Sequence, residues 1–505
     1  MTACRRLFPR LVARASLLAL CGALALAPAH SQLPTLGDGS DMTSISERKL
    51  GERIARELYR DPDYIDDPVL VEYVQGLWQP LLAAARARGD SSGELGERFA
   101  WQVLLGKDRT INAFALPGGW LGLHLGLIAA TSSRDELASV LAHELSHVTQ
   151  RHISRLMSQQ SRQTPWLIAG IILGAIAASR NPEAGNAVMA GTQALAMQNQ
   201  LAYSRDMERE ADRIGLGVLT QAGFDPQGFV TMFEKLQLAA RLNDNGNYPY
   251  LRSHPMTTER VAEMQSRQQL EPRPAAAPEP STEYAMIAAR ARVLSNPGVD
   301  ALRGYVADAD SATLRAQGPA KQAAALYAAI LADSRLRDNR AAARLGARLA
   351  TVAAAEPRAA RLARLLDAEV ALAANDAPRT LASVDLVAGR RPDVLLATQA
   401  MLLQGSALDA AQRLQTWVAA NPKDAPAWQL LARAYAAQAQ PLRAIRAEAE
   451  AQVALLDYSA AMDRFKAAQE LARRSGGSAD YIEASIIDTR ARQVESLLRE
   501  QALER

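Results

Sequence analysis

Two histidines and a glutamate within five residues could together perform metal-assisted hydrolysis. His143 and His147 lie four positions apart, about 400° around an α-helix, so their imidazoles point the same way and can bind one Zn²⁺. Glu144 follows the first histidine, where it can take a proton from a metal-bound water. The pattern H-E-x-x-H is short enough to occur by chance, so its interpretation depends on the surrounding sequence.

A second segment offers the third protein ligand that a catalytic zinc normally has. Residues 204–212 are S-R-D-M-E-R-E-A-D, in which Glu208 and Asp212 share one helical face. We expect Glu208 to bind the metal and Asp212 to accept the other ring N–H of a ligand histidine. Glu210 lies about 200° away and should point elsewhere. Alone, these carboxylates would indicate a solvated helix face, but together with H-E-x-x-H they favour a metal site.

The neighbouring sequence predicts the elements that position these residues. Ser133 followed by Glu136 is a capping box, and apolar residues then recur at helical spacing as far as Val148. Upstream, residues 110–116 and 120–125 have strand composition and are separated by Pro-Gly-Gly. A strand beside the metal helix could pair with an extended substrate. The residues expected to do so are Asn112, Ala113, Phe114 and Ala115.

These motifs resemble those of the zinc peptidase family that includes HtpX and the CAAX-prenyl endoproteases. That family has H-E-x-x-H followed by S-R-x-x-E-x-x-A-D, and residues 112–119 are similar to its region before the first motif. The resemblance implies a mainly α fold with an α+β zincin-like peptidase domain containing a small β-sheet. It also implies one Zn²⁺ per chain. The implied ligands are His143, His147 and Glu208, with Glu144 as general base and Asp212 as a supporting or proton-donating residue.

A later histidine adds to the implied site. The resemblance implies that His254 lies near the metal, either as a fourth ligand or as a group that stabilises the tetrahedral intermediate. Arg260 would then help neutralise the developing oxyanion. Without the resemblance, His254-Pro255 would be interpreted as the start of a helix. If His254 closes the site, the enzyme is latent until it moves, because zinc needs an open position to activate water.

Two other histidines are weaker candidates. His152 lies five residues after His147, about 140° around a continuous helix, and is expected at the surface. His124 lies on the second predicted strand and is expected to be structural. Neither is predicted to bind the metal.

Residues 1–31 have the pattern of a cleavable signal peptide. A basic region precedes an apolar stretch at 16–26, and the segment ends in the small-x-small tripeptide A-H-S. We therefore expect export to the periplasm, with cleavage before Gln32. Cys21 raises a lipoprotein alternative, which Leu20 disfavours because a lipobox has a small residue there. Both cysteines of the chain lie in this segment, so the stability of the mature protein must come from packing.

Charge and hydropathy restrict the partners. The leader holds four arginines and no acidic residue, so its removal leaves 53 of 57 basic residues against 54 acidic ones. A net charge of about −1 argues against nucleic acid as the main partner. The apolar run 166–178 has 13 residues, whereas a membrane span needs about 20. We expect buried or lid-like helices over 166–201, with peripheral contact to a membrane surface as the alternative.

Composition divides the mature chain into two domains. Residues 32–270 form the expected peptidase domain, and the Pro- and Ala-rich residues 271–282 a linker. Residues 283–505 predict short helices that form a tetratricopeptide-like solenoid, with a generic helical bundle as the alternative. The spacing that indicates the repeat involves Trp428, Leu431, Ala432 and Tyr435 in a first helix and Ala461, Phe465 and Ala468 in a second.

An exported peptidase of this family with helical repeats is similar to family members that act in quality control of outer-membrane β-barrel proteins. The resemblance alone implies the partners, which are unfolded or stalled β-barrel proteins and the machinery that assembles them. It also implies two activities, degradation of stalled proteins and assistance to assembly. The alternative is a chaperone or scaffold that acts through its repeats and has a latent peptidase. A membrane-embedded prenyl-type endoprotease is disfavoured because long apolar spans are missing.

Overall fold

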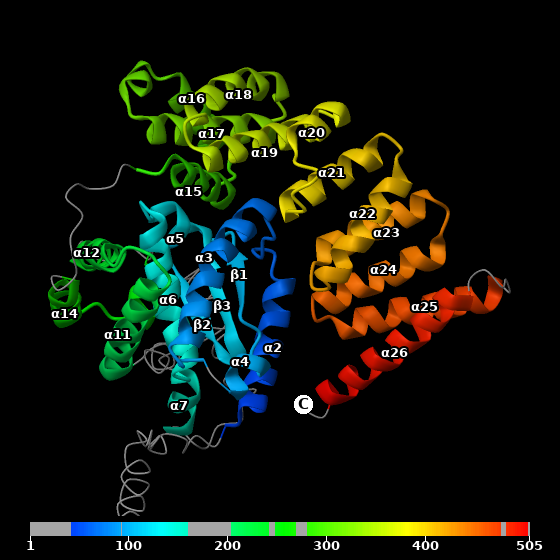
Figure 1. The fold of residues 1–505 in the computed structure, drawn as a ribbon, viewed down its shortest axis with the longest axis horizontal. Helices are drawn as coiled ribbons and strands as arrows, with labels where there is room; N and C mark the ends of the chain where they lie inside the picture. The colour runs from blue at the N-terminus through cyan, green and yellow to red at the C-terminus, as the bar shows by residue number, and fades with distance from the viewer. Residues whose placement is uncertain are drawn as a thin grey trace, which may run out of the picture. The chain divides into compact units, whose positions relative to one another are not determined.

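A computed structural model describes residues 42–91, 93–159, 204–241, 248–268, 280–475 and 481–502. The predicted leader, the apolar stretch 166–201 and residues 271–279 of the predicted linker lie outside these ranges. The described residues are mainly helical, with one small sheet early in the chain and a long helical region after it (Figure 1). The predicted fold class is therefore confirmed.

The sheet has three strands in the order β1-β3-β2. Strand β1 (Gln102–Gly106) is parallel to β3 (Trp120–His124), and β2 (Ala113–Leu116) is antiparallel to β3. The two strands expected from the sequence are β2 and β3, while β1 was not predicted. The turn between β2 and β3 is the 3₁₀ element η1 (Pro117–Gly119), in which Gly118 and Gly119 have φ values of 72° and 84°. Such left-handed backbone is open to glycine at little cost.

Two helices carry the residues expected at the metal site. Helix α6 (Arg134–Thr149) begins at Ser133, whose hydroxyl accepts a hydrogen bond from the Glu136 N–H, as the capping box predicts. Helix α11 (Arg205–Gln221) begins in the same way at Ser204 and packs against α6. Every residue of α6 from Glu136 onwards is buried, so its polar side chains must find partners inside the protein.

The remaining helices of the first region surround this pair and the sheet. They are α2 (Ser44–Arg60), α3 (Pro68–Ala87), α4 (Glu94–Arg98), α5 (Leu125–Ala130), α7 (His152–Gln159), α12 (Gln227–Arg241), α13 (Tyr250–Ser253) and α14 (Thr258–Gln268). Helices α3, α11 and α12 all contact α6, and β2 contacts it too. The metal helix is therefore central to this region.

The helical region that follows is built from helices that pack on their neighbours in sequence. They are α15 (Thr282–Ser295), α16 (Val299–Asp310), η2 (Ala312–Ala316), α17 (Pro319–Arg335), α18 (Asn339–Ala353), α19 (Pro357–Ala373), α20 (Ala377–Ser383), α21 (Arg391–Leu403), α22 (Ala407–Ala420), α23 (Ala425–Ala437), α24 (Pro441–Ala454), α25 (Tyr458–Ser475) and α26 (Tyr481–Ala502). The residues that suggested the repeat lie on α23 and α25, and most are buried. The tetratricopeptide assignment stays a prediction.

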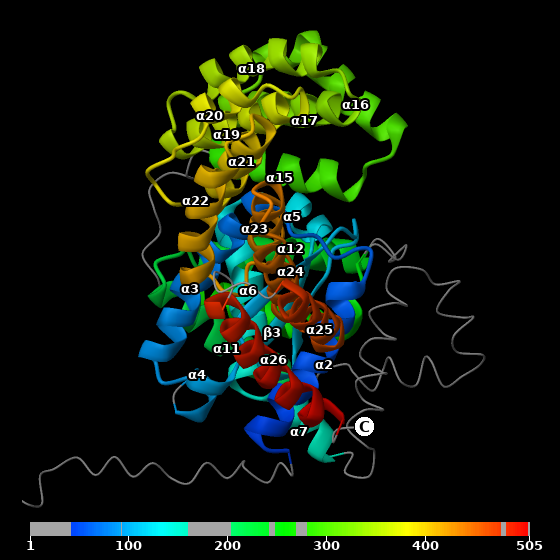
Figure 2. The same cartoon turned by 90° about the vertical axis from the view of Figure 1, so that its right-hand side faces the viewer.

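Helix α15, the first after the predicted linker, packs against α5, and the two run close together in both ribbon views (Figures 1 and 2). Its Arg290 is 3% exposed and binds Asp67, which caps helix α3. The same guanidinium binds Tyr327 and Glu369 from α17 and α19. We call Arg290, Asp67, Glu369 and Tyr327 the junction cluster. It joins the sheet-containing region to the helices that follow.

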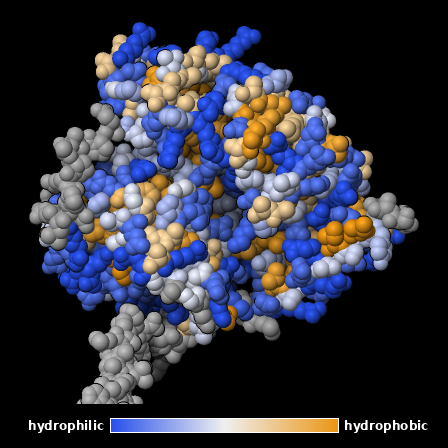
Figure 3. Space-filling view, viewed as in Figure 1, coloured by the Kyte–Doolittle hydropathy of each residue, from blue (hydrophilic) through white to orange (hydrophobic). Residues whose placement is uncertain are grey.

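The surface drawn in Figure 3 is mostly hydrophilic, with apolar side chains in small separate patches. Among the most exposed large apolar side chains are Val387, between α20 and α21, and Tyr481 and Ile482 at the start of α26. Within the described ranges, no helix combines the length and apolar character needed to cross a membrane.

Candidate metal centre

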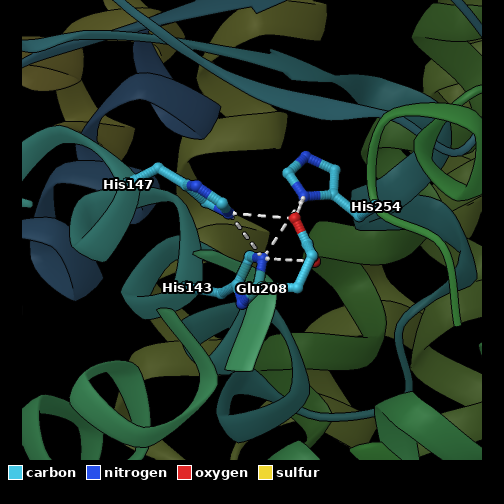
Figure 4. A group of neighbouring side chains, drawn as sticks. All are labelled: His143, His147, Glu208 and His254. Carbon is cyan, nitrogen blue, oxygen red and sulfur yellow. Dashed lines mark hydrogen bonds and ion pairs between the residues drawn. The ribbon is translucent and has the colours of Figure 1, made fainter. Parts of the chain in front are cut away.

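Helices α6 and α11 bring together the three predicted metal ligands (Figure 4). Nε2 of His143 lies 3.0 Å from Nε2 of His147. The Glu208 carboxylate lies 3.5 Å from each of these nitrogens, through Oε2 to His143 and Oε1 to His147. All three side chains are buried. Glu208, 61 positions after His147, thus converges with the two histidines, as expected for the third ligand of one metal.

His254 completes this group from the turn after α13. Its Nδ1 lies 3.0 Å from Glu208 Oε1 and 3.3 Å from His143 Nε2, and its ring stacks on Tyr250 at a centroid distance of 4.5 Å. The ligand atoms of His143, His147, Glu208 and His254 all lie within 4.8 Å of one another. His254 is 0% exposed, so its ring is enclosed with the other three. The structure therefore places it where a fourth ligand would lie.

Glu144 lies at the same centre and is 0% exposed. Neither of its carboxylate oxygens accepts a hydrogen bond from the described residues, and Nε2 of His254 lies 3.4 Å from Oε1. A buried carboxylate without hydrogen bonds is costly unless another group interacts with it. Its position beside the ligand group is the one predicted for the general base.

Asp212 and Arg260 form a second layer behind the ligands. Oδ1 of Asp212 lies 3.0 Å from Nδ1 of His143, as expected for the group that orients a ligand histidine. Arg260 donates two hydrogen bonds of 2.7 Å to Asp212, and its Nη1 lies 2.7 Å from Glu208 Oε2. The guanidinium is 3% exposed and lies 5.1 Å from the centre of the Phe233 ring. Arg260 thus holds two carboxylates in place, and its predicted role at the oxyanion stays a prediction.

The charges of this group fit a divalent cation. The carboxylates of Glu144, Glu208 and Asp212 carry three formal negative charges, and Arg260 carries one positive charge, which leaves −2 when the histidines are neutral. Four ligands at about 2.0–2.1 Å from a tetrahedral zinc lie about 3.3–3.4 Å apart, close to the separations given above. The residues present therefore fit Zn²⁺ in both charge and spacing.

The pKa shifts of the metal-free site follow from the same excess of negative charge. Burial lowers the pKa of His143, but its contacts with Asp212 and Glu208 outweigh burial and raise this pKa to about 9. Burial and the neighbouring His143 hold the pKa of His147 well below its ordinary value. Burial opposes ionisation of Glu208, yet the nearby His254, His143 and Arg260 hold its pKa well below the usual range. Without a metal, a proton on His143 takes over part of the compensation.

The comparison with protein families agrees with this geometry. Residues 82–268, which include all the groups described above, match the model of Peptidase family M48. These residues are a peptidase family M48 domain. M48 is a zinc metallopeptidase family, so zinc is the metal that the cluster in this domain would hold.

Relatives with the same kind of domain have related names. The chain is 37% identical over 298 residues to the putative beta-barrel assembly-enhancing protease of Vibrio cholerae, covering 57% of this chain and 58% of that protein. It is 35% identical over 245 residues to the beta-barrel assembly-enhancing protease of Escherichia coli, covering 48% of each. It is 32% identical over 159 residues to the mitochondrial metalloendopeptidase OMA1 of Arabidopsis thaliana, covering 32% and 30%. The chain thus spans about half the length of the first two relatives.

One histidine of the M48 domain lies elsewhere than expected. His152 was predicted at the surface, but it is 0% exposed and its Nδ1 lies 2.8 Å from Nδ1 of His147. The prediction was wrong because it assumed one continuous helix, whereas α6 ends at Thr149 and Arg151 has a φ of 51°. Glu210 points away from the ligand group as expected, and contacts His152. His124 is buried and hydrogen-bonded to Thr110, and its structural role stays a prediction.

The predicted substrate strand lies at an edge of the sheet in the M48 domain. Among the described residues, β2 pairs only with β3, and Asn112 lies just before β2 with its carbonyl accepting the His124 N–H. Ala113 and Ala115 are buried, whereas Phe114, on the other face, is half-buried. The strand contacts α6, so an extended peptide along its edge would lie beside the metal helix.

Sequence reasoning missed Tyr250 as well as the buried position of His152. Tyr250 is 3% exposed, stacks on His254 and donates its N–H to the Ile111 carbonyl at 3.3 Å. The only indication in the sequence was that Tyr250 lies four residues before His254, a spacing that brings two side chains together in a helical turn. Tyr250 therefore links the His254 turn to the start of the edge strand.

Proposed function

We propose that this chain is a zinc-dependent endopeptidase that degrades unfolded or stalled outer-membrane β-barrel proteins and assists their assembly. The buried group of His143, His147, Glu208 and His254, with Glu144 beside it, is the observation that carries the peptidase activity. The names of the relatives from Vibrio cholerae and Escherichia coli support the β-barrel clients and the assembly machinery as partners.

The residues of the chain have distinct roles in the proposed mechanism. His143, His147 and Glu208 would hold the zinc ion, which when bound acts as a Lewis acid on the scissile carbonyl and lowers the pKa of water. Glu144 accepts the proton of the attacking water on a carboxylate oxygen and passes it to the leaving amine. Asp212 Oδ1, 3.0 Å from Nδ1 of His143, favours the tautomer with its proton on Nδ1 and thereby keeps Nε2 available to the metal. Arg260 orients both Glu208 and Asp212 through ion pairs of 2.7 Å.

The edge strand supports an extended substrate. A peptide that pairs with β2 must offer its own backbone groups, so a folded domain is a poor substrate and an unpaired β segment is a good one. β-barrel proteins that have stalled before closure expose such segments. This matches the client class in the names of the relatives.

We also propose that the protein acts in the periplasm. The basic and then apolar pattern of residues 1–31 supports export. The helical region beyond residue 282 supports a docking role, because stacked helices offer a surface for protein segments. Peripheral contact with a membrane remains part of the proposal.

One observation favours a second function. His254 lies in contact with Glu208 and Glu144 together, in the space beside the general base. A resting enzyme in this arrangement would have low activity and could act mainly as a chaperone or scaffold through its helical region. The two functions differ in whether assembly needs Glu144.

The test combines metal analysis with cleavage of a client. Purified protein is assayed for zinc content and incubated with an unfolded outer-membrane β-barrel protein and, separately, with the same protein already folded. We expect one zinc per chain, cleavage of the unfolded client, and loss of cleavage with retained zinc in Glu144→Gln. Glu136→Gln, a buried glutamate on the same helix, is the matched control and should cleave normally.

Two results would reject parts of the proposal. Cleavage by Glu144→Gln at the wild-type rate would remove Glu144 from the mechanism. Normal β-barrel assembly in cells that contain only Glu144→Gln would favour the chaperone function over the peptidase.

A further inference from the structure

His152 lies against His147, a predicted metal ligand, and the helix is interrupted between α6 and α7. Helix α6 ends at Thr149, and Arg151 has a φ of 51°, a left-handed conformation that is unfavourable for a non-glycine residue. The Arg151 side chain holds this turn by donating hydrogen bonds to Glu47 Oε2 at 3.0 Å and to the Met42 carbonyl at 2.7 Å. The costly backbone is thus stabilised by specific contacts.

The interruption allows a series of side-chain contacts that starts at His147, which we call the His147 contact series. Nδ1 of His147 lies 2.8 Å from Nδ1 of His152, and Nε2 of His152 lies 3.1 Å from Glu210 Oε2. Nη1 of Arg155 donates to the same Glu210 oxygen at 2.8 Å. His152 is 0% exposed, whereas the Glu210 side chain is 30% exposed. The His147 contact series therefore runs from the buried ligand group towards the surface.

Only one arrangement of protons satisfies these contacts when His147 binds a metal. Nε2 of His147 faces His143 and Glu208, so the ring proton must be on Nδ1, which then donates to Nδ1 of His152. His152 must in turn carry its proton on Nε2, which donates to Glu210. Arg155 keeps Glu210 as an acceptor by binding the same oxygen. Glu210 thus sets the tautomer of His152, and His152 sets that of His147.

We propose that His152 and Glu210 are positioning residues that fix the tautomer and ring orientation of His147 for zinc. In His143, Nδ1 lies 3.0 Å from Asp212 Oδ1. In His147, Nδ1 instead lies 2.8 Å from Nδ1 of His152, whose Nε2 contacts Glu210. Glu210 lies on α11 two residues after Glu208, so the His147 contact series also links His147 to the helix that carries the third predicted ligand. This inference rests on the proposed zinc site.

The alternative is that His152 only fills space in the core. A core role predicts a loss of stability without a specific loss of metal affinity. A positioning role predicts that a folded variant without His152 binds zinc more weakly than the wild type, because the His147 ring is no longer held in the productive orientation. Zinc affinity of the otherwise intact full chain therefore distinguishes the two roles.

The experiment measures zinc affinity of metal-free protein by competition with a chromophoric chelator, beside thermal unfolding of the same metal-free samples. We expect His152→Ala to lower zinc affinity by about 10–100-fold. His152→Gln should recover part of this loss, because its amide can accept from His147 and donate to Glu210. His124→Ala removes another buried histidine, on β3, and should leave zinc affinity unchanged.

A second variant guards against misfolding. If His152→Ala does not fold, Glu210→Ala decides, because that carboxylate is nearer the surface, and we expect it to lower zinc affinity by about 10-fold. Asp206→Ala, which removes an exposed carboxylate from the same helix, is its control. Equal zinc affinity in the folded His152→Ala and His124→Ala variants, or in the two α11 variants, overturns this inference alone. Absence of zinc binding by the wild type overturns the zinc site and this inference together.

Discussion

The metal centre and the junction cluster are both built from buried charges, but only one of them is complete. In the junction cluster, the Arg290 guanidinium binds Asp67, Glu369 and Tyr327 through hydrogen bonds of 2.7–3.0 Å. None of these four side chains has a buried polar atom without a hydrogen bond. At the metal centre, by contrast, both oxygens of the 0% exposed Glu144 lack one among the described residues.

This difference separates a structural cluster from a functional one. A buried cluster that only supports the fold gains by saturating its hydrogen bonds and compensating its charges. With neutral histidines, the metal centre has a formal charge of −2, and its Glu144 carboxylate has no hydrogen bond among the described residues. Such a site retains the capacity to bind a cation and to accept a proton. Buried polar groups without hydrogen bonds therefore distinguish the functional cluster from the structural one, whereas burial alone does not.

Metal removal should have the largest effect, and only at the metal centre. Chelation of zinc should abolish peptidase activity and destabilise the protein by about 4 kcal/mol relative to a solution with zinc at 1,000 times its Kd. The reason is that the excess negative charge loses its compensating ion. Activity assays and thermal unfolding, before and after zinc is restored, check this. Full activity in zinc-free protein would contradict the assignment of a metal-binding role to the metal centre.

Breaking the junction cluster should affect stability without affecting zinc. Arg290→Ala leaves Asp67 and Glu369 without their cation, so we expect a loss of about 3–5 kcal/mol in the free energy of unfolding. Arg60→Ala, which removes a more exposed ion pair with Asp457, should cost at most about 1 kcal/mol. Urea unfolding of both variants measures the difference, and zinc content should equal that of the wild type. A loss of zinc in Arg290→Ala would show that the two clusters are coupled.

Replacement of His254 should produce a smaller change at the metal centre. Because its ring lies in contact with both Glu144 and Glu208, His254→Ala should free the space beside the general base and raise cleavage of an unfolded client several-fold. Steady-state cleavage rates, with zinc content as control, measure this. A fall in cleavage at unchanged zinc content would instead assign His254 to stabilisation of the transition state.

The last expected effect is a pH dependence of stability, which is confined to the metal-free protein. The pKa of His143 is raised to about 9 by Asp212 and Glu208 against the opposing effect of burial, while the unfolded chain has the ordinary value of 6.5. The folded state therefore binds the proton more tightly, and this contribution to stability is complete below pH 6.5 and is lost as the pH rises through 9. Thermal unfolding of metal-free protein across this range should show the loss. Zinc-loaded protein should not, because the metal replaces the proton.

The sequence predicted the site better than its surroundings. Helical spacing was sufficient to pair His143 with His147 and Glu208 with Asp212, because residues four apart on one helix share a face wherever that helix packs. It was not sufficient for His152, since the break after Thr149 depends on the contacts of Arg151 with Glu47 and Met42, more than 100 residues earlier. Strand β1 was also missed, because its pairing with β3 is long-range.

The sequence by itself indicated metal-assisted hydrolysis, zinc as the metal, and the two helices that carry the predicted ligands, because these inferences depend on residue type and local period. Tertiary structure alone decided how these helices meet, that Tyr250 stacks on His254, and that His152 lies against His147. It also decided which buried charges compensate one another at the junction cluster and which remain available at the metal centre. The physical reason is that hydrogen-bond satisfaction and charge balance are properties of contacts between distant segments, which no local pattern records.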